Sequence, residues 1–474
     1  MTFYFFDVET SGFSPRTDRI MQFAGQRIDM DLNPIDQPDN ILIKLTPDVL
    51  PEPGAVLVHG IAPQKTLNEG ISEKEFCKYL TGQVSMPNTI MVGYNNIRFD
   101  NEFLRFTLWR NFYDAYEWSW KEGCSTWDLL DVARMTRALR PEGINWPFAP
   151  DGKPSNKLEY LSAVNKLDHV DAHDAMSDVK ASIAVARLIK QKQPKLFKYL
   201  FNIRSKDKAA PLVTKGDPLV YTSGRYPAEF EKTTIAVIVA KKADRTGALV
   251  YDLRIDPGEF KDLSADELAK RWADRSDGAP YFPVKELRYN RCPAVAPLSV
   301  LDMAGMKRLK LHKEIIADHL TELQKAKNFG DKLIEALDMM WPPRQPEMVV
   351  DQRKVDGQLY DAFVPDEDRT KMSLLRAAKP DQLSDLKLDF KDVRLKALLP
   401  LYKARNFPEV LTTIEKKLWE DFRRQKLLAG DDTSQVARFF AQLEELDKTP
   451  GLDAEKRGLL EELKHYGESA IPAV

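Results

Sequence analysis

Four acidic residues and one histidine stand at the ends of regularly patterned segments within about the first 180 residues, and they restrict how this chain can fold. Asp7 and Glu9 end an aromatic segment, Asp100 follows a second apolar segment, and His173 and Asp178 lie where a helical pattern begins. Carboxylates that converge on one point repel each other unless a cation neutralises them. These side chains are therefore expected on a scaffold of strands and helices, around a bound cation.

The first cluster ends a segment, residues 3–9, whose aromatic and β-branched side chains predict a buried strand. Side chains alternate along a strand, so Asp7 and Glu9 project to the same face. An isolated Asp-x-Glu is more often a strand end that turns into solvent. Thr10, Ser11 and Gly12 follow, and a sharp turn at this glycine would let the backbone approach a ligand closely, which favours a binding site.

The second and third clusters lie at the starts of two expected helices. Residues 90–95 predict a strand and residues 99–112 a helix, so Asp100 lies near a helix start, where the helix dipole explains an acid equally well. A further helix is expected over residues 175–192. If both residues lay in one regular helix, His173 and Asp178 would be about 140° apart in rotation about the helix axis. We therefore place His173 in the loop before that helix, from which both side chains can face one point.

The chemistry of these side chains favours a metal-dependent nuclease. A hard divalent ion such as Mg²⁺ takes a few carboxylate oxygens and leaves coordination positions open for a substrate phosphate. Two such ions about 3.5–4 Å apart stabilise the attacking and leaving oxygens of a phosphodiester. A single histidine is more often a surface or capping residue, so only its combination with the acids favours a catalytic role for His173.

In chain order, Asp-x-Glu, a middle Asp and His-x-x-x-x-Asp resemble the DEDDh exonuclease superfamily, whose fold is a mixed sheet flanked by helices, related to ribonuclease H. The resemblance implies that Asp7, Glu9, Asp100 and Asp178 bind two Mg²⁺ ions, with Mn²⁺ as a substitute, and that His173 is the general base. An unperturbed histidine pKa near 6.5 suits proton transfer from water at neutral pH. All five expected residue types are present.

Longer segments resemble the bacterial exonuclease I family. They are GYNNIRFD at 93–100, RNFYD at 110–114, WSW at 118–120, WDLLD at 127–131, LRPEGINWP at 139–147, AHDAM at 172–176 and YKARNFP at 402–408. The resemblance spans nearly the whole chain and is weakest over residues 213–298. It implies processive 3′→5′ hydrolysis of single-stranded DNA to 5′-mononucleotides, in DNA repair and recombination. It also implies binding of the acidic C-terminal tail of single-stranded-DNA-binding protein.

Aromatic and basic residues over 105–134 suit a single strand, because bases stack on rings while cations hold phosphates. By position in the family, the substrate contacts are Glu9, Thr10, Arg105, Tyr116, Trp120, Arg134 and Lys157. The family has an arginine at position 157, and a lysine keeps the charge but loses the bidentate fork. We expect Phe112 and Trp118 to be buried and Tyr116 and Trp120 to be more exposed. Thr10 and the next loop are expected to hold the 3′-terminal nucleotide, although Ser11 and Gly12 cannot read a base.

A chain of 474 residues predicts two or three domains. Residues 1–194 are expected to form the α/β, ribonuclease H-like exonuclease domain with a mixed sheet. Residues 195–346 have short strands and helical stretches, which in the family form an SH3-like β domain with helical insertions. The Trp-Pro-Pro segment at 341–343 breaks the chain. Residues 350–474 predict an all-α domain, and we expect the second and third domains to enclose the DNA strand.

The formal net charge of −2 excludes a protein that coats DNA through a global positive field, so binding requires a local basic groove. Three isolated cysteines favour a reducing cytoplasm and argue against a structural zinc site. The sequence predicts no signal peptide and no membrane span. We expect a cytoplasmic monomer.

Two alternatives fit parts of the pattern. One is another exonuclease of the same superfamily, which acts on RNA or serves as a proofreading subunit, but smaller relatives lack the long C-terminal part. The other is a catalytically silent nucleic-acid-binding scaffold. Loss of an acid or of the histidine would mark such a scaffold, and none is lost.

Overall fold

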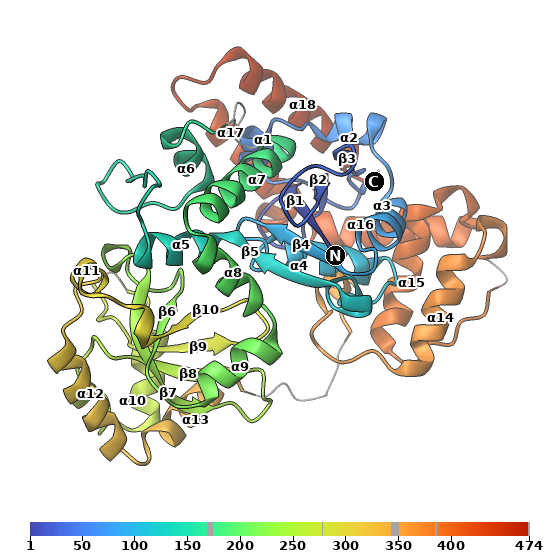
Figure 1. Cartoon of the computed structure of the whole chain (residues 1–474). Coiled ribbons are helices and arrows are strands. Elements are labelled where there is room, and N and C mark those ends of the chain that lie inside the picture. The colour runs from blue at the N-terminus through green and yellow to red at the C-terminus, as the bar shows by residue number, and fades with distance from the viewer. Residues whose placement is uncertain (168–173, 277, 343–349, 384–385, 473–474) are drawn as a thin grey trace.

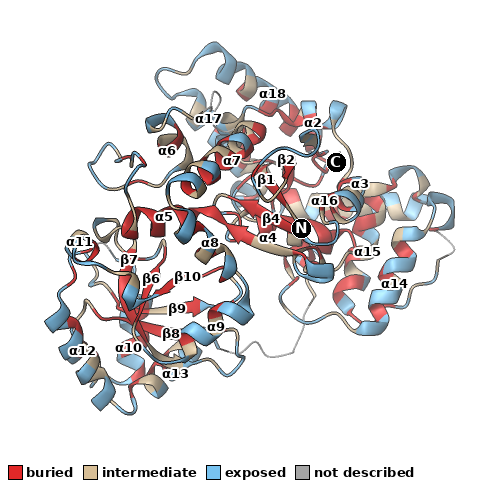
Figure 2. Ribbon diagram, viewed as in Figure 1, coloured by how far each residue is buried: buried red, intermediate tan, exposed pale blue. Residues whose placement is uncertain are grey.

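A computed structural model describes residues 1–167, 174–276, 278–342, 350–383 and 386–472. It contains two five-stranded sheets and a C-terminal group of helices that packs beside the first sheet (Figure 1). Most strand residues are buried, whereas the helices at the periphery expose one side (Figure 2). Among the helices of these residue ranges, none is long and apolar enough to cross a membrane.

The first sheet is mixed, as the sequence predicts. Its order is β3-β2-β1-β4-β5; β1 runs antiparallel to β2 and parallel to β4, and β4 is parallel to β5. The strands are β1 (Thr2–Thr10), β2 (Ile20–Ile28), β3 (Asp39–Leu42), β4 (Thr89–Gly93) and β5 (Ser125–Asp128). Strand β1 is therefore central, with helices on both faces (Figure 1).

Alternation along β1 separates two hydrophobic cores. Phe3 and Phe5 join a core with α5 (Leu129–Leu139) and α7 (Ala175–Lys192). Tyr4, Phe6 and Val8 join another core with α3 (Glu73–Tyr79) and α4 (Asp100–Arg110). Because the period is two, Asp7 and Glu9 continue the Phe3 face, which α7 covers. The local pattern of one strand thus aims both carboxylates at α7.

The second sheet is antiparallel throughout, in the order β10-β6-β7-β8-β9. Its strands are β6 (Leu219–Thr222), β7 (Thr233–Lys241), β8 (Gly247–Asp252), β9 (Val284–Arg288) and β10 (Ala294–Pro297). Two of the helical stretches expected over 195–346 are α12 (Lys313–Lys325) and α13 (Phe329–Met340). Helix α10 (Ala265–Ala273) precedes them.

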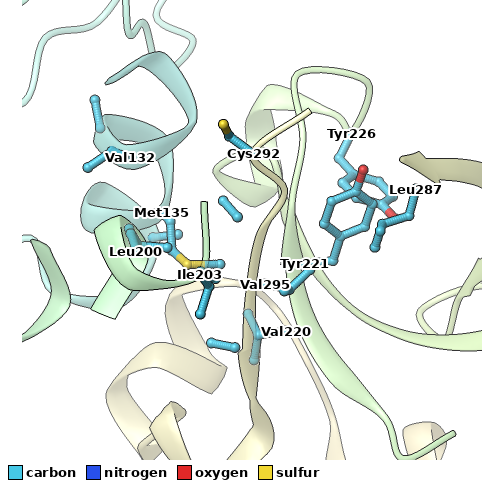
Figure 3. Close-up of a cluster of buried hydrophobic side chains, with 14 of the residues drawn as sticks. Val132, Met135, Leu200, Ile203, Val220, Tyr221, Tyr226, Leu287, Cys292 and Val295 are labelled. Carbon is cyan, nitrogen blue, oxygen red and sulfur yellow. The ribbon is translucent and has the colours of Figure 1, made fainter. Parts of the chain in front are cut away.

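The core between the two sheets is continuous. Val132 and Met135 of α5 and Leu200 of α8 (Pro194–Asn202) approach Val220 and Val295 of the second sheet in one buried cluster (Figure 3). Other helices of the first two thirds of the chain are α1 (Pro53–His59), α2 (Pro63–Glu69), α6 (Leu158–Val164), α9 (Lys206–Thr214) and α11 (Met303–Arg308). Apolar packing therefore fixes the second sheet relative to the first.

The C-terminal part is helical, as expected. Its helices are α14 (Asp366–Ala377), α15 (Val393–Asn406), α16 (Thr413–Leu428), α17 (Gln435–Asp447) and α18 (Ala454–Ala470). Trp109 and Phe112 of the α4 region share a buried core with Leu398 of α15. Helices α17 and α18 enclose Val56 of α1 in another small core. The C-terminal helices thus pack directly on the segment that carries the acidic clusters.

Candidate active site

Three of the predicted acids meet at one point. Asp7 and Glu9 project from β1 towards α7, and Asp178 lies in the first turn of that helix. One carboxylate oxygen from each residue lies within 4.8 Å of those of the other two. The strand and the helix therefore bring together residues that are separated by about 170 positions in the sequence.

The fourth acid, Asp100, lies beside this group. It is the first residue of α4, and its Oδ1 accepts a hydrogen bond from the backbone N–H of Val8 at 3.2 Å. Strands β1 and β4 pair up to Phe5 and Val92, so Val8 lies beyond the last pair. The Asp100 carboxylate occupies the place that a longer β4 would take, at the carboxyl end of two parallel strands.

The electrostatics of the group call for a cation. Burial, with Asp100 and Glu9 as neighbours, raises the pKa of Asp7 well above its usual range. Burial, together with Asp178 and Asp100, raises the pKa of Glu9 to about 9. Burial raises the pKa of Asp100 to about 7, although backbone N–H groups oppose the shift. A divalent cation removes such repulsion, and a donor set made of carboxylate oxygens fits a hard ion such as Mg²⁺.

The predicted base, His173, lies outside the described residues. The next residue, Asp174, caps α7, and its carboxylate accepts a hydrogen bond from the Ser177 backbone N–H at 3.0 Å. The pKa of Glu9 is raised mainly by burial, then by the charges of Asp178 and Asp100, and to a smaller extent by the charge of Asp174. Sequence reasoning did not single out Asp174. An acid directly before a helical pattern is the capping signal that could have found it.

Asp128 is a second residue that sequence reasoning missed as part of the site. It caps α5 through the Leu130 N–H at 2.9 Å and also accepts the Asn95 N–H at 2.9 Å. Asn95 has a positive φ of 74°, a conformation that needs such support. Asp128 thus fixes the loop between β4 and Asp100, and burial, with Asp131 nearby, raises its pKa to about 6.

Two predicted DNA contacts lie together. The Arg105 guanidinium lies 5.5 Å from the centre of the Tyr116 ring and pairs with Glu102 at 2.7 Å. Tyr116 is half-buried, and Trp120 has an exposed fraction of 62%. Phe112 and Trp118 are buried, as expected. The stretch therefore presents one stacked cation–aromatic pair and one freely accessible indole ring.

The remaining predicted contacts have protein partners. Arg134 pairs with Asp131 at 2.7 Å, and Lys157, two thirds exposed, lies 3.3 Å from Glu159. Thr10 is buried, and its hydroxyl donates to the Gly12 carbonyl at 2.7 Å. These positions are compatible with substrate contact, which remains a prediction for each of them.

Three family models match the chain in sequence. Residues 4–186 match a model described as Exonuclease, residues 204–338 match the Exonuclease I SH3-like domain, and residues 353–470 match the Exonuclease I C-terminal domain. Together the three matches follow the three structural parts: the mixed sheet, the antiparallel sheet and the C-terminal helices.

Known proteins resemble the chain over its full length. Exodeoxyribonuclease I of Haemophilus influenzae is 38% identical over 474 residues, which cover 98% of each chain. A zinc-ion-bound crystal structure of the Escherichia coli exonuclease I–single-stranded DNA complex is 37% identical, with a TM-score of 0.92 over 99% of each chain. A crystal structure of SSB and exonuclease I with the inhibitor CFAM is 37% identical, with a TM-score of 0.90 over 99% of each chain.

Proposed function

The chain belongs to the exonuclease I family, and from that premise we propose that it removes 5′-mononucleotides processively from the 3′ end of single-stranded DNA. It is a nuclease. The observation that carries the proposal is the convergence of the Asp7, Glu9 and Asp178 oxygens within 4.8 Å. The single-stranded DNA bound by the Escherichia coli relative supports the choice of substrate.

Asp7, Glu9, Asp100 and Asp178 would hold two divalent cations, Mg²⁺ in the cell with Mn²⁺ as a substitute. When bound, such ions activate a water and stabilise the charge that develops on the leaving oxygen. The zinc-ion-bound form of the Escherichia coli relative supports divalent-ion binding in this family. The raised pKa values of Asp7 and Glu9 without a cation support the same assignment.

The chain itself supplies rigid ligand positions and a base. Asp7 and Glu9 are fixed by the pairing of β1, and Asp178 by the capped first turn of α7. His173 precedes the capping residue Asp174 in the sequence. We assign His173 the proton of the attacking water, since a neutral imidazole near its ordinary pKa accepts a proton at neutral pH.

Contacts to the strand would come from both sides of the acidic group. Glu9 and Thr10 would hold the 3′-terminal nucleotide, and the stacked Arg105–Tyr116 pair with Trp120 would take the bases and phosphates behind it. Arg134 and Lys157 would exchange Asp131 and Glu159 for phosphate oxygens. The ammonium group of Lys157 would bind phosphate less specifically than a bidentate guanidinium.

The wider role is also a proposal. We infer a cytoplasmic monomer that acts in DNA repair and recombination, divided into domains at 1–194, 195–346 and 350–474. The three cysteines, Cys77, Cys124 and Cys292, are buried and form no disulfide, in keeping with a reducing compartment. The SSB present with the related exonuclease I supports binding of the acidic SSB tail.

A time course on end-labelled oligonucleotides tests the proposed function. We expect stepwise shortening of 5′-labelled single-stranded DNA with Mg²⁺, immediate release of label from the 3′-labelled strand, and no reaction with chelator. Duplex DNA and single-stranded RNA are run beside it. Preferred degradation of RNA would assign the protein to another branch of the superfamily, and no metal-dependent cleavage of any substrate would contradict the proposal.

A further inference from the structure

Glu102 of α4 contacts all three structural parts of the chain. Its Oε1 lies 2.7 Å from Nη1 of Arg105, one helical turn further along α4, and 3.9 Å from Nη2 of Arg291, between β9 and β10 of the second sheet. Its Oε2 accepts a hydrogen bond at 2.5 Å from the hydroxyl of Tyr360, which precedes α14 in the C-terminal part. One carboxylate therefore joins three parts of the chain beside a predicted DNA contact, Arg105.

These contacts are largely shielded from water. The side chains of Glu102 and Arg105 are 14% and 22% exposed, and the Tyr360 ring packs edge-on against Phe106 with 5.5 Å between the ring centres. Burial raises the pKa of Tyr360 above its usual range, and Glu102 adds to the shift although Arg105 opposes it. The Tyr360 hydroxyl therefore remains a donor to Glu102 at neutral pH.

The place of Arg105 depends on Glu102. The Arg105 guanidinium lies 5.5 Å from the centre of the Tyr116 ring, and that ring lies 6.4 Å from the Tyr360 ring. An arginine side chain has many rotamers, and fixing one of them costs conformational entropy. Because Glu102 already fixes Arg105, less of that entropy is lost when a strand binds.

The same carboxylate keeps two like charges together. Burial and the charges of Arg288 and Arg105 lower the pKa of Arg291, and the charge of Glu102 opposes the shift. One carboxylate does not neutralise the two guanidinium groups of Arg105 and Arg291. A net positive charge therefore remains at this place, and a guanidinium group suits the oxygens of a phosphate.

We propose that Glu102 is a positioning residue for DNA binding, which acts through Arg105 and does not contact the strand itself. The assignment rests on the proposed function and deepens it, because Arg105 is one of the predicted substrate contacts. A carboxylate that only repelled phosphate would weaken binding, so its removal would strengthen binding. Positioning has the opposite sign, because its removal weakens binding.

Steady-state hydrolysis of a 5′-labelled single strand by the full-length protein with Mg²⁺ decides between the two signs. We expect Glu102→Gln to raise KM about fivefold, which corresponds to the upper end of the range for an exposed ion pair, and to leave kcat unchanged. Tyr360→Phe, which removes one hydroxyl and keeps the ring, should raise KM less. Glu420→Gln breaks a matched pair, with Arg423 three residues later on α16, and should leave KM unchanged.

A double-mutant cycle shows whether the effect passes through Arg105. Arg105→Gln should raise KM at least as much as Glu102→Gln, and adding Glu102→Gln or Tyr360→Phe to it should change KM no further. In Glu102→Gln, the slope of log KM against log salt concentration should fall by about 0.7, which is the loss of one phosphate contact on a single strand. If Glu102→Gln does not fold, the cycle of Tyr360→Phe with Arg105→Gln gives the same test.

A lower or unchanged KM for Glu102→Gln, or effects of Glu102→Gln and Arg105→Gln that add in full, would overturn the proposal. If the wild type does not hydrolyse DNA at all, the proposed function fails. Fluorescence anisotropy of a labelled strand with chelator then gives Kd for the same variants, and it decides separately whether Glu102 positions Arg105.

Discussion

Arg19 Nη2 lies 2.7 Å from Asp356 Oδ2, and both side chains are buried although 337 residues separate them in the sequence. Arg405 contacts Asp356 at 2.8 Å and Asp48 at 2.7 Å, and Lys426 reaches Asp48 at 2.6 Å. We call these five residues the buried ion cluster. It joins the C-terminal helices to the loop that follows β1, so buried ion pairs connect these two parts of the chain.

Breaking this cluster should destabilise the whole protein. Asp356→Asn leaves the buried guanidinium groups of Arg19 and Arg405 with one carboxylate fewer. Removing one partner of a buried ion pair costs about 3–5 kcal/mol, and we expect a loss of about 3 kcal/mol, since Asp48 remains. Urea unfolding followed by circular dichroism measures it. Asp366→Asn makes the same chemical change at a fully exposed carboxylate and should leave the urea concentration at the unfolding midpoint unchanged. Equal midpoints for the two variants would contradict the prediction.

The cluster also sets how stability responds to acid. Burial alone would raise the pKa of Asp48 and of Asp356, but Arg405, Lys426 and Arg19 outweigh burial and hold both pKa values well below their usual range. A carboxyl with a lower pKa in the folded than in the unfolded chain binds fewer protons when folded. Its stabilisation is therefore complete above the unfolded pKa of about 3.9 and is lost as the pH falls below it.

We expect the urea midpoint of the wild type to fall between pH 5 and pH 3, and that of Asp356→Asn to fall less over the same interval. Parallel curves for the two proteins would show that Asp356 does not contribute to the acid sensitivity.

Local patterns were enough to predict much of the site. The period of β1 placed Asp7 and Glu9 on one face, and the helix expected over 175–192 is α7 with the same bounds. Both features depend on neighbouring residues alone. That these acids share a site with Asp178 was implied by the resemblance to the exonuclease superfamily and not by the local patterns; in the structure one carboxylate oxygen of each of the three residues lies within 4.8 Å of those of the other two.

Strand β2 could not be predicted in this way. All nine of its residues are buried, including Gln22, Gln26 and Arg27. Arg27 finds its partners in the Thr89 hydroxyl at 3.0 Å and the Val84 carbonyl at 2.8 Å, and Gln22 donates to Asn40 at 2.8 Å. Polar residues on both faces hide the alternation of a strand, and only tertiary contacts make their burial possible. The buried Arg19–Asp356 ion pair likewise depends on a contact between distant parts of the chain, which no local pattern predicts.

The proposed role of His173 as a base gives a kinetic prediction. His173→Ala should lower kcat about 10²–10⁴-fold, the usual contribution of a positioned base. In the wild type, log kcat should rise with pH up to the imidazole pKa, about 6.5 when unperturbed, and then level off. The variant should lose that limb. Measurements of kcat from pH 5.5 to 8.5 at saturating Mg²⁺ test both expectations. If kcat of the variant still rises with pH as it does in the wild type, the base is another group.

Deleting residues 350–474 should prevent folding. The deletion would expose Trp109 and Phe112, which are buried against Leu398 and Tyr402, and would leave Arg19 without Asp356. We expect a truncated protein that elutes as aggregate from size exclusion and lacks near-ultraviolet circular dichroism. A soluble truncation with native circular dichroism would contradict this packing argument. Whether the C-terminal helices make hydrolysis processive therefore has to be measured in the full-length chain, with excess unlabelled strand as a trap.

The central claim is that Asp7, Glu9, Asp100 and Asp178 bind the divalent ions that cleave the strand. Calorimetric titration with Mn²⁺, followed by a hydrolysis assay on the same samples, tests it most directly for the wild type and Asp178→Asn. We predict that the wild type binds two ions and that Asp178→Asn binds fewer and shows no detectable hydrolysis. In chelator the variant should be at least as stable as the wild type, because it lacks one of the carboxylates that repel each other in the absence of a cation. Near wild-type hydrolysis by Asp178→Asn would contradict the claim.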